Sequence, residues 1–530
     1  MGEQARGVKI LTFHSFALKL LAQKVQHNSQ LDSVISQATK ALQNNQISLP
    51  YTEMLMLDEY QDINKQSYEF IKAIFSQMSG EKQIIAVGDD DQLIMEFNGA
   101  NQKFMQDFAS DFGQVEDLAQ DSNTQDKQAF SKHTLSTNYR SGGKIIDFIN
   151  AFRQAFLHSS LKKQNLAPSY NNQHKGFVSF THHKHNLSLQ AIAKQIKEIL
   201  ATHDCSSDSK IALLLRNNDE VLSAQYELEN LGIKTACLLE RDKFEAGDLI
   251  ELWEFLELLK KGIDKEIAQA KICQKYAKSS NLVYFNRALE VFEREYEEDL
   301  AFIKTQKSTD GTRLKDFGNK LLAKDFETFL SELKFEEIKQ TKAKVIIATM
   351  HKAKGKEFDI VFVGIKRDFA FSDSSEKRLL YVAFSRAKKQ LHIHAQGEEL
   401  HRLCAHFNKY NICEAQESSP SKIRYEMGLD DIFLSYEKAQ HNLKHLELVA
   451  GDKVEIRQDL QDLQERIELF YRSKCVGRLS KAFTNTLLDK IASGYTLQSS
   501  AMIKYVVQWR NKERETMTTQ VLCEIILSRN

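Results

Sequence analysis

Two short acidic segments of this sequence carry the residue types that suit metal-assisted chemistry on a phosphate. Residues 55–62 read LMLDEYQD and residues 84–92 read IIAVGDDDQ, so each is an apolar run that ends abruptly in carboxylates. Clustered carboxylates repel one another and are costly to desolvate, and a bound cation compensates for both effects. Because Mg²⁺ binds through one or two carboxylates, waters and substrate phosphates, Asp58 suits a metal site. Glu59 suits the orientation or deprotonation of a water molecule.

The elements that must position these acids are two parallel strands. Each apolar run is too short for a helix, whereas residues 64–75 between them carry apolar side chains at helical spacing. A strand–helix–strand unit with a right-handed crossover brings both acidic ends to the same edge of one sheet. An exposed acidic turn after a core strand is the simpler interpretation of either segment by itself.

Composition predicts a helix-rich globular α/β protein. The 530 residues are 42% hydrophobic and 27% charged, with only three prolines, and this length predicts about three or four domains. Lys+Arg and Asp+Glu are both 72, so any nucleic-acid binding must use local basic patches. The seven cysteines form no CxxC pair, which indicates reduced thiols of a cytoplasmic protein. No apolar run reaches membrane-spanning length, so no membrane partner is expected.

The acidic pair resembles the Walker B motif and the following motif of UvrD/Rep-like superfamily 1 DNA helicases. Four more segments resemble motifs of this family, in the family's order: TFHSF at 12–16, LSTNYRS at 135–141, TMHKAKGKEF at 349–358 and EKRLLYVAFSRAK at 376–388. The resemblance covers roughly residues 8 to 400 and implies an α/β fold with two RecA-like parallel-sheet lobes. The first lobe is expected to be truncated at its N-terminus, and a small β-rich module is expected at the C-terminus.

The resemblance also implies domain boundaries. A truncated first lobe is expected at 1–120, and a second lobe at 133–240 and 339–412. A helical insertion is expected at 241–338. The resemblance stops past residues 416–420, and there the strand pattern of the residues themselves predicts a β-rich accessory module at 423–530. Within that module we expect five strands, at 453–457, 467–472, 475–479, 501–510 and 520–527. We also expect one helix, at 485–492. Its basic residues suit either nucleic-acid binding or a solvated face of a half-buried sheet.

By resemblance, this protein uses ATP and Mg²⁺ for 3′→5′ translocation on single-stranded DNA with duplex unwinding, in DNA repair or recombination. Glu59 would act in the hydrolysis of ATP. The other implied catalytic residues would sense or stabilise the γ-phosphate, and they are Gln92, Arg140 and Arg386. Asp58 would hold the metal, with Gly355 and Glu357 near the nucleotide. Arg140 and Arg386 could instead be solvated cations at the ends of helices.

Single-stranded DNA and duplex junctions are the implied partners. The residues expected to contact DNA are Thr12, His14, Ser15, Phe97, Thr349 and His351. Met95 stands where the family has a stacking tyrosine and Asn98 where it has an arginine. Since aromatic stacking contributes about 1–3 kcal/mol per base, the loss of one platform predicts weaker DNA binding.

A phosphate-binding loop, GxxGxGK[ST], is expected before the TFHSF motif, and the printed sequence has none there or elsewhere. We therefore expect a truncated product, a missing strand supplied by another chain, or a protein that no longer hydrolyses ATP. The competing hypothesis is a non-catalytic DNA-binding or partner-binding remnant. A subunit of a helicase–nuclease ranks lower, because no nuclease pattern of carboxylates and lysine stands out near the C-terminus.

Three further segments have alternatives. Residues 8–12 are expected to form a strand that runs into a helix. Residues 345–363 suit either two strands around a functional turn or a simple hairpin. His182, His183 and His185 follow an expected strand, where a solvated strand end is commoner than a metal site.

Overall fold

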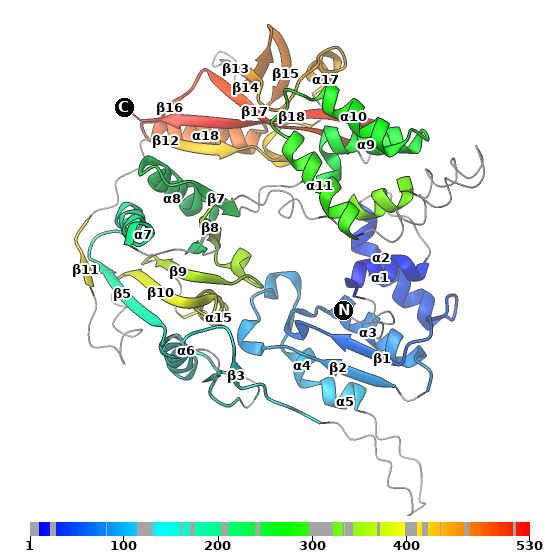
Figure 1. Cartoon of the computed structure of the whole chain (residues 1–530), viewed down its shortest axis with the longest axis vertical. Helices are drawn as coiled ribbons and strands as arrows, with labels where there is room; N and C mark the ends of the chain where they lie inside the picture. The colour runs from blue at the N-terminus through cyan, green and yellow to red at the C-terminus, as the bar shows by residue number, and fades with distance from the viewer. Residues whose placement is uncertain are drawn as a thin grey trace, which may run out of the picture. The chain divides into compact units, whose positions relative to one another are not determined.

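The computed structural model (Figure 1) describes the chain in eighteen stretches. The chain forms two compact units. The first unit takes residues 1–187, 209–214 and 350–415, and the second takes 188–208, 215–349 and 416–530. The described residues are 10–21, 28–80, 82–113, 131–159, 161, 163–169, 175–202, 210–238, 244–295, 322–330, 333, 343–367, 372–397, 411–415, 422–434, 436–459, 466–511 and 516–529.

The acidic segments follow two parallel strands of the first unit. Strand β1 (Met54–Leu57) pairs with β2 (Gln83–Ala86), and helix α3 (Lys65–Gln77) connects them. The Asn64 side chain accepts a hydrogen bond from the Ser67 N–H at 2.9 Å, which caps the start of α3. The predicted strand–helix–strand unit is therefore confirmed, and both acidic turns begin at the same edge of this sheet.

Only one face of the β1–β2 sheet is covered. Leu57 and Ile71 of α3 belong to one buried cluster, and Leu55 and Ile84 pack against it. The opposite face is open in the described part of the chain, where Met56 is 66% exposed. Short apolar runs of this kind predict parallel strands that are buried on both faces, and this prediction is wrong for the open face. Parallel strands are buried only where layers cover both faces of the sheet, and the sequence alone does not show which layers are present.

A second parallel sheet of the first unit has the strand order β11-β5-β10-β9-β6. Its central strand β9 lies between β10 and β6 and pairs in parallel with both. The hairpin alternative for residues 345–363 is therefore wrong, because a hairpin requires an antiparallel partner. Helix α6 packs against this sheet through Phe148, whose ring lies 5.6 Å from that of Phe180 in β5 and 5.2 Å from that of Phe384 in α15.

The elements of the first unit have the following bounds. The helices are α1 (Phe13–Leu21), α2 (Asn28–Gln43), α4 (Lys103–Gln106), α5 (Phe108–Phe112), α6 (Gly143–Phe156) and α15 (Ser374–Phe384), and the short 3-10 turns are η2 (Tyr60–Asp62), η3 (Asp90–Gln92), η4 (Glu96–Asn98) and η6 (His351–Ala353). The other strands are β3 (Thr137–Asn138), β4 (Ala167–Pro168), β5 (Phe177–His183), β6 (Ile211–Leu215), β9 (Phe358–Ile365), β10 (Ala387–Gln396) and β11 (Asn411–Cys413).

The strand expected at residues 8–12 is not present at 10–12, and residues 1–9 lie outside the described part. Thr12 instead begins α1: its hydroxyl accepts a hydrogen bond from the Ser15 N–H at 3.1 Å, and Phe13 and Phe16 pack inward. A Thr in this position satisfies an N–H that the first turn of a helix leaves unpaired. Ile10 is 84% exposed, so residues before the cap gain no burial that favours a strand.

An antiparallel sheet organises the C-terminal part of the second unit. Its strand order is β12-β18-β17-β13-β14-β15, with β16 beside β18. The five strands and the helix expected in this region are confirmed, and the bounds are β12 (Lys422–Glu426), β13 (Lys453–Asp459), β14 (Arg466–Tyr471), β15 (Lys474–Arg478), α18 (Lys481–Ala492), β16 (Thr496–Leu497), β17 (Ser500–Asn511) and β18 (Thr516–Ser528).

Helices make up most of the remaining second unit. They are α7 (Leu189–Thr202), α8 (Asn218–Asn230), α9 (Ile250–Lys260), α10 (Lys265–Lys275), α11 (Leu282–Glu295) and α17 (Glu437–Leu443), with the turns η5 (Ala246–Asp248) and η7 (Leu429–Asp431), and strands β7 (Thr235–Leu238) and β8 (Val345–Thr349) pair in parallel. A large apolar cluster joins α9, α11 and the helical residues 322–330 to the antiparallel sheet. Among the described helices, none has the length and apolar character that a membrane crossing requires.

Candidate active site

The first acidic turn places Asp58 and Glu59 at the carboxyl end of β1, and both residues are exposed. The Asp58 Oδ1 accepts a hydrogen bond from the Glu59 N–H at 2.9 Å. Glu59 has a φ of 49°, a left-handed conformation that is uncommon for a residue other than glycine and that gathers at functional sites. One exposed carboxylate beside a second fits a Mg²⁺ ion that also binds substrate phosphates.

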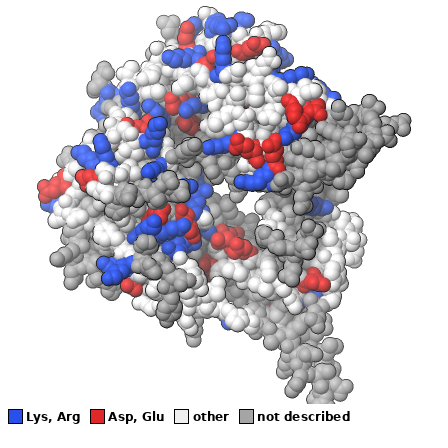
Figure 2. All heavy atoms as spheres, viewed as in Figure 1, with Lys and Arg blue, Asp and Glu red and all other residues white. Residues whose placement is uncertain are grey.

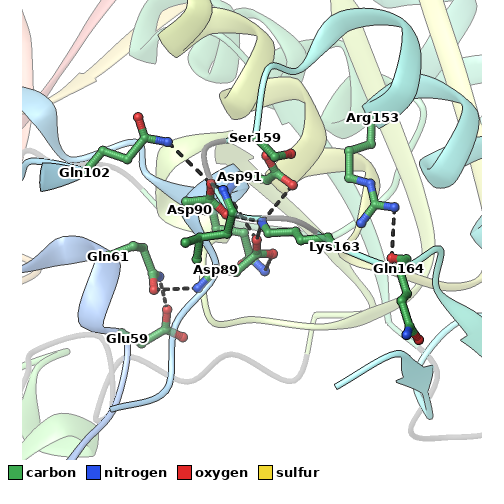
Figure 3. A network of polar contacts seen from close by, with 12 residues as sticks. Glu59, Gln61, Asp89, Asp90, Asp91, Gln102, Arg153, Ser159, Lys163 and Gln164 are labelled. Carbon is green, nitrogen blue, oxygen red and sulfur yellow. Dashed lines mark hydrogen bonds and ion pairs between the residues drawn. The ribbon is translucent and has the colours of Figure 1, made fainter. Parts of the chain in front are cut away.

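Gln61 connects this turn to the second acidic turn. Its side chain is 1% exposed. Its Nε2 donates to a carboxylate oxygen of Glu59, and its Oε1 accepts from the Asp89 N–H at 3.0 Å (Figure 3). A Cβ atom at Gly88 would lie 2.7 Å from the Gln61 Oε1. Glycine is therefore required at position 88 for this amide to reach both turns.

The second acidic turn is compensated by a lysine from another part of the first unit. The carboxylates of Asp89, Asp90 and Asp91 are the one group of three metal-ligating side chains among the described residues, and the Lys163 ammonium group lies among them (Figure 3). Burial lowers the pKa of Lys163, but the three carboxylates outweigh burial and raise it. Lys163 thus supplies the cation at this turn, and Asp58 remains the expected metal ligand.

Gln92 and Arg386 meet at the end of the second acidic turn. The Gln92 Nε2 donates to the Asp89 Oδ2 at 2.8 Å, and its Oε1 accepts from the Arg386 Nη2 at 3.3 Å. Two residues predicted from separate motifs to act on a γ-phosphate are therefore in contact. They are 294 positions apart in the chain, so no local pattern could show this contact.

Arg386 is buried, with 3% of its surface exposed. Helix α15 ends at Phe384, so the alternative of a solvated cation at the end of a helix is wrong for Arg386. The pKa of Arg386 is lowered to about 10, because burial and, to a smaller extent, the charge of Arg140 lower it more than the charges of Glu59 and Glu357 raise it. Charged groups from four motifs therefore interact electrostatically around this guanidinium group.

Arg140 lies on the other side of Arg386. Its Nε donates to the Glu357 Oε1 at 2.5 Å, and its Nη1 donates to the Ser385 carbonyl at 3.3 Å. The Lys388 Nζ lies 3.0 Å from the other oxygen of Glu357. Burial raises the pKa of Glu357, but hydrogen bonds from Arg140 and Lys388 outweigh it and lower the pKa. Glu357 is thus ionised and holds both cations in place.

These side chains border an open cavity of about 510 Å³. Its lining residues are Thr137, Asn138, Tyr139, Arg140, Glu357 and Lys388. Two cations suit phosphate oxygens, and the Tyr139 ring, 77% exposed, suits stacking against a base. Tyr139 was missed as a site residue, although it lies inside the LSTNYRS motif.

Lys354 is a second residue of the candidate site that the sequence analysis did not single out. Its Nζ contacts both carboxylate oxygens of Asp62, at 2.6 and 2.7 Å, and donates to the Gln92 carbonyl at 3.0 Å. The neighbouring Gly355 has a φ of 76°, and a Cβ added there would meet no atom within 4 Å. The role of Gly355 near the nucleotide stays a prediction. Both Lys354 and Asp62 lie inside recognised motifs, and this position was the only indication in the sequence that they belong to the site.

The residues expected to contact DNA are only partly brought together. Phe97, 71% exposed, has its ring 6.1 Å from that of His351 in an edge-to-face arrangement. Thr12, His14 and Ser15 form the start of α1, where Thr12 and His14 are exposed. Thr349 ends β8 in the second unit and is 6% exposed. DNA contact by these six residues remains a prediction.

The histidines at the expected strand end lie elsewhere. His182 and His183 are inside β5, so their expected position after the strand is wrong. The His183 Nε2 lies 3.0 Å from the Nδ1 of the buried His394 of β10. Burial lowers the pKa of His183 to about 4 and that of His394 well below its ordinary value. Two neutral rings that bond each other form part of the core of this sheet.

Parallel strands that end in acidic turns, in a unit that also has a cavity lined by two cations, place the chain among α/β proteins whose functional side chains lie at the carboxyl ends of strands. The UvrD/REP helicase N-terminal domain matches residues 34–113, and the UvrD-like helicase C-terminal domain matches residues 133–313 and 260–398. Together these matches cover more than half of the chain. The chain belongs to the UvrD-like helicase family.

Curated relatives carry names that agree with this family. A probable DNA helicase II homologue of Mycoplasma pneumoniae is 25% identical over 479 residues, which cover 76% of this chain and 63% of that protein. The ATP-dependent DNA helicase Rep of Buchnera aphidicola is 24% identical, with coverage of 68% and 66%. The ATP-dependent DNA helicase PcrA of Staphylococcus epidermidis is 22% identical, with coverage of 64% and 54%. The chain thus spans less than two thirds of the length of these relatives.

A solved structure also matches the chain. It is the C-terminal domain of a possible DNA helicase from Lactobacillus plantarum, 16% identical, and the match covers 52% of this chain and 98% of that one. The TM-score is 0.25. At that value the likeness carries no information about the fold.

Proposed function

We propose that this protein is an ATP-dependent DNA helicase or translocase of the UvrD type that moves 3′→5′ on single-stranded DNA and unwinds duplex in repair or recombination. The observation that carries the proposal is the contact between Gln92 and Arg386. It joins the acidic turns to the arginines beside the cavity, and the charges of Glu59, Arg140 and Glu357 act on the same guanidinium group. The names of the relatives, which describe DNA helicases, support the substrate.

In the proposed reaction Glu59 accepts the proton of the attacking water. Arg140 and Arg386 stabilise the negative charge that develops on the transferred phosphoryl group, and Gln92 positions Arg386 through their hydrogen bond. A Mg²⁺ ion held by Asp58 would neutralise phosphate charge. Tyr139 packs against the base of the nucleotide. Phe97 and His351 contact the DNA strand. Phe97 closely follows Gln92 in the chain, so a change at Gln92 that depends on the nucleotide reaches the DNA through the residues between them.

The printed residues contain no GxxGxGK[ST] stretch, and the proposal predicts that hydrolysis depends on one. Two proteins test this: the 530-residue chain, and the same chain joined to an N-terminal segment of a UvrD-like relative that carries the stretch. We expect negligible ATP hydrolysis by the first. We expect hydrolysis stimulated by single-stranded DNA in the second, abolished by Glu59→Gln and unchanged by the control Glu53→Gln at an exposed position.

Two results would count against the proposal. Robust hydrolysis by the 530-residue chain would contradict the dependence on the stretch. Hydrolysis by the joined chain that survives Glu59→Gln would refute the role of Glu59.

A non-catalytic DNA-binding remnant is the second candidate, and the exposed Phe97 ring beside His351 favours it independently of ATP. The two candidates differ in their response to nucleotide. A remnant binds single-stranded DNA with the same affinity in the presence and absence of a non-hydrolysable ATP analogue. The helicase proposal expects the joined chain to change its affinity severalfold.

A further inference from the structure

Three consecutive carboxylates surround one ammonium group in the first unit. The Lys163 Nζ lies 2.8 Å from the Asp91 Oδ2 and also contacts the carboxylates of Asp89 and Asp90. The site is mostly closed to solvent, since the side chains of Asp90, Asp91 and Lys163 are 0%, 3% and 16% exposed. Buried charges of one sign are costly unless an opposite charge compensates them, and Lys163 provides that charge.

The segment that carries Lys163 is held firmly against the turn. The Ser159 hydroxyl donates to the Asp91 Oδ1 at 2.7 Å, and the Leu161 N–H donates to the Asp90 Oδ2 at 3.2 Å. On the far side, the buried Arg153 of α6 donates to the Gln164 carbonyl at 3.0 Å (Figure 3). A lysine fixed at both ends of its segment acts as a positioned charge rather than as a mobile surface cation.

The turn that Lys163 compensates also orients Gln92. One oxygen of the Asp89 carboxylate accepts from the Asp91 N–H at 3.1 Å and contacts Lys163, and the other accepts from Gln92 at 2.8 Å. Gln92 in turn accepts from Arg386. A continuous set of polar contacts therefore runs from Lys163 through Asp89 and Gln92 to Arg386.

We infer that Lys163 is a positioning residue: its ammonium group holds the Asp89–Asp91 turn in the shape that presents Gln92 to Arg386. The effect of Lys163 on turnover rests on the proposed function. Its effect on the shape of the turn rests on the contacts alone. Lys163 touches neither nucleotide nor water in this scheme. It acts through the carboxylates, and its loss leaves three adjacent negative charges without their cation.

The first test needs no nucleotide. Hydrogen exchange is measured on the wild-type chain and on Lys163→Met, Lys163→Arg and the control Lys144→Met, which replaces an exposed lysine of α6. In Lys163→Met we expect protection of residues 88–95 to fall about tenfold or more, since a buried charge loses its partner. Helix α6 should keep its protection, Lys163→Arg should recover most of the loss, and Lys144→Met should match the wild type.

A purely structural role predicts a different pattern, namely an equal loss over α6 and residues 88–95. That pattern, or unchanged protection of 88–95 in Lys163→Met, would overturn the inference. If Lys163→Met does not fold, Asp89→Asn takes its place. This variant keeps Lys163 but weakens the acceptor of Gln92, so we expect the same local loss of protection at 88–95, and its absence would likewise refute the inference.

The second test measures turnover in the joined chain that carries the phosphate-binding stretch. We expect Lys163→Met to lower kcat about tenfold with KM for ATP within about twofold, because Gln92 and Arg386 act on the transition state rather than on binding. If Lys163→Met does not lower the protection of residues 88–95, that result alone refutes Lys163 as a positioning residue. Absence of hydrolysis in the unmodified joined chain refutes the proposed function and leaves the exchange result to stand by itself.

Discussion

Gln61 is the residue on which the geometry of both acidic turns depends. Its buried amide joins the Glu59 carboxylate to the Asp89 N–H, so the expected base and the acidic turn before Gln92 share one side chain. Gly88 lies directly against it. The φ of Gly88 is not positive, so glycine is required by the close approach of Gln61 rather than by the backbone conformation.

Gly88→Ala tests this close approach. The added methyl group would overlap the Gln61 Oε1 and crowd two backbone N–H groups at 3.1 and 3.2 Å, so we expect a loss of about 1–3 kcal/mol in stability. Hydrogen exchange of β1 and β2 under native conditions measures it. Gly143→Ala is the matched control, since its Cβ would meet only ordinary contact at 3.8 Å. Equal protection in the two variants would show that Gln61 has room to move.

Phe97→Ala tests the exposed aromatic platform. An exposed ring beside His351 can stack on a base, so we expect single-stranded DNA to bind about tenfold more weakly, within the range of about 1–3 kcal/mol per stacked base. Fluorescence anisotropy with a labelled oligonucleotide gives the affinity. Tyr51→Ala, which removes a ring that is 78% exposed elsewhere in the first unit, should leave the affinity unchanged. No change on losing Phe97 would remove it from the DNA interface.

At the scale of elements, strands β5 and β10 are joined by polar as well as apolar side chains. Ser179 of β5 lies 2.8 Å from the Nδ1 of His392 on β10, whose ring stacks on Phe362 of β9 at 4.5 Å. His183 and His394 make the second such pair. Ser179 lies opposite His392 in the register of β5 against β10, whereas His183 lies opposite Gln396 and reaches His394 diagonally, so these polar pairs add specific contacts between the two strands.

This arrangement predicts acid sensitivity of the first unit. The folded state holds His183 and His394 neutral, with the His183 pKa lowered to about 4, whereas an unfolded histidine has a pKa of about 6.5. Below that value the unfolded state binds more protons, so stability is full above it and falls as the pH drops toward 4. Each histidine contributes up to about 1.4 kcal/mol per pH unit.

The dependence of stability on pH is measured by denaturation at several pH values between 7.5 and 5. Hydrogen exchange of β5 and β10 monitors the unfolding of the first unit. We expect His394→Gln to reduce the dependence on pH by roughly half, whatever it does to stability at pH 7.5. His185→Asn replaces an exposed histidine and should keep the wild-type slope. An unchanged slope in His394→Gln would mean that this pair does not govern the acid response.

At the scale of the whole molecule, the charge is balanced locally as well as in total. Figure 2 shows Lys and Arg interspersed with Asp and Glu over the visible face. This agrees with the equal numbers of basic and acidic residues, since Lys+Arg and Asp+Glu are both 72. In the first unit, Lys163, Lys354 and Lys388 each contact carboxylates.

The second unit has an aromatic core of its own, which predicts an independent response to mutation. Phe326 is fully buried, with its ring 5.1 Å from Phe255 and 5.0 Å from Phe292, so Phe326→Ala should cost about 3–5 kcal/mol. Both tryptophans of the chain, Trp253 and Trp509, lie in this unit, so tryptophan fluorescence reports its unfolding. The control Ile267→Ala, at a position 54% exposed, should have little effect.

Exchange at β5 and β10 should be unaffected by Phe326→Ala if the two units unfold separately. A parallel loss of protection there would show instead that the chain unfolds as a single cooperative unit.

The amino-acid sequence by itself determined the local elements and the family. The β1–α3–β2 unit, the strands of the C-terminal sheet and the helix α18 follow from apolar periodicity within short windows, which depends only on neighbouring residues. The motifs identified the acids and arginines in the same way. Their catalytic and DNA-binding roles, and the domain boundaries, remain predictions.

Only the tertiary structure decided which of these residues meet. Lys163 reaches Asp91 across 72 positions and Lys354 reaches Asp62 across 292, and no local pattern encodes such a pairing. It likewise decided that Arg386 is buried, that His183 of β5 is a core residue and that, among the described residues, one face of the β1–β2 sheet is open. Burial and charge compensation depend on which segments the fold brings together, and that is a property of the packed chain.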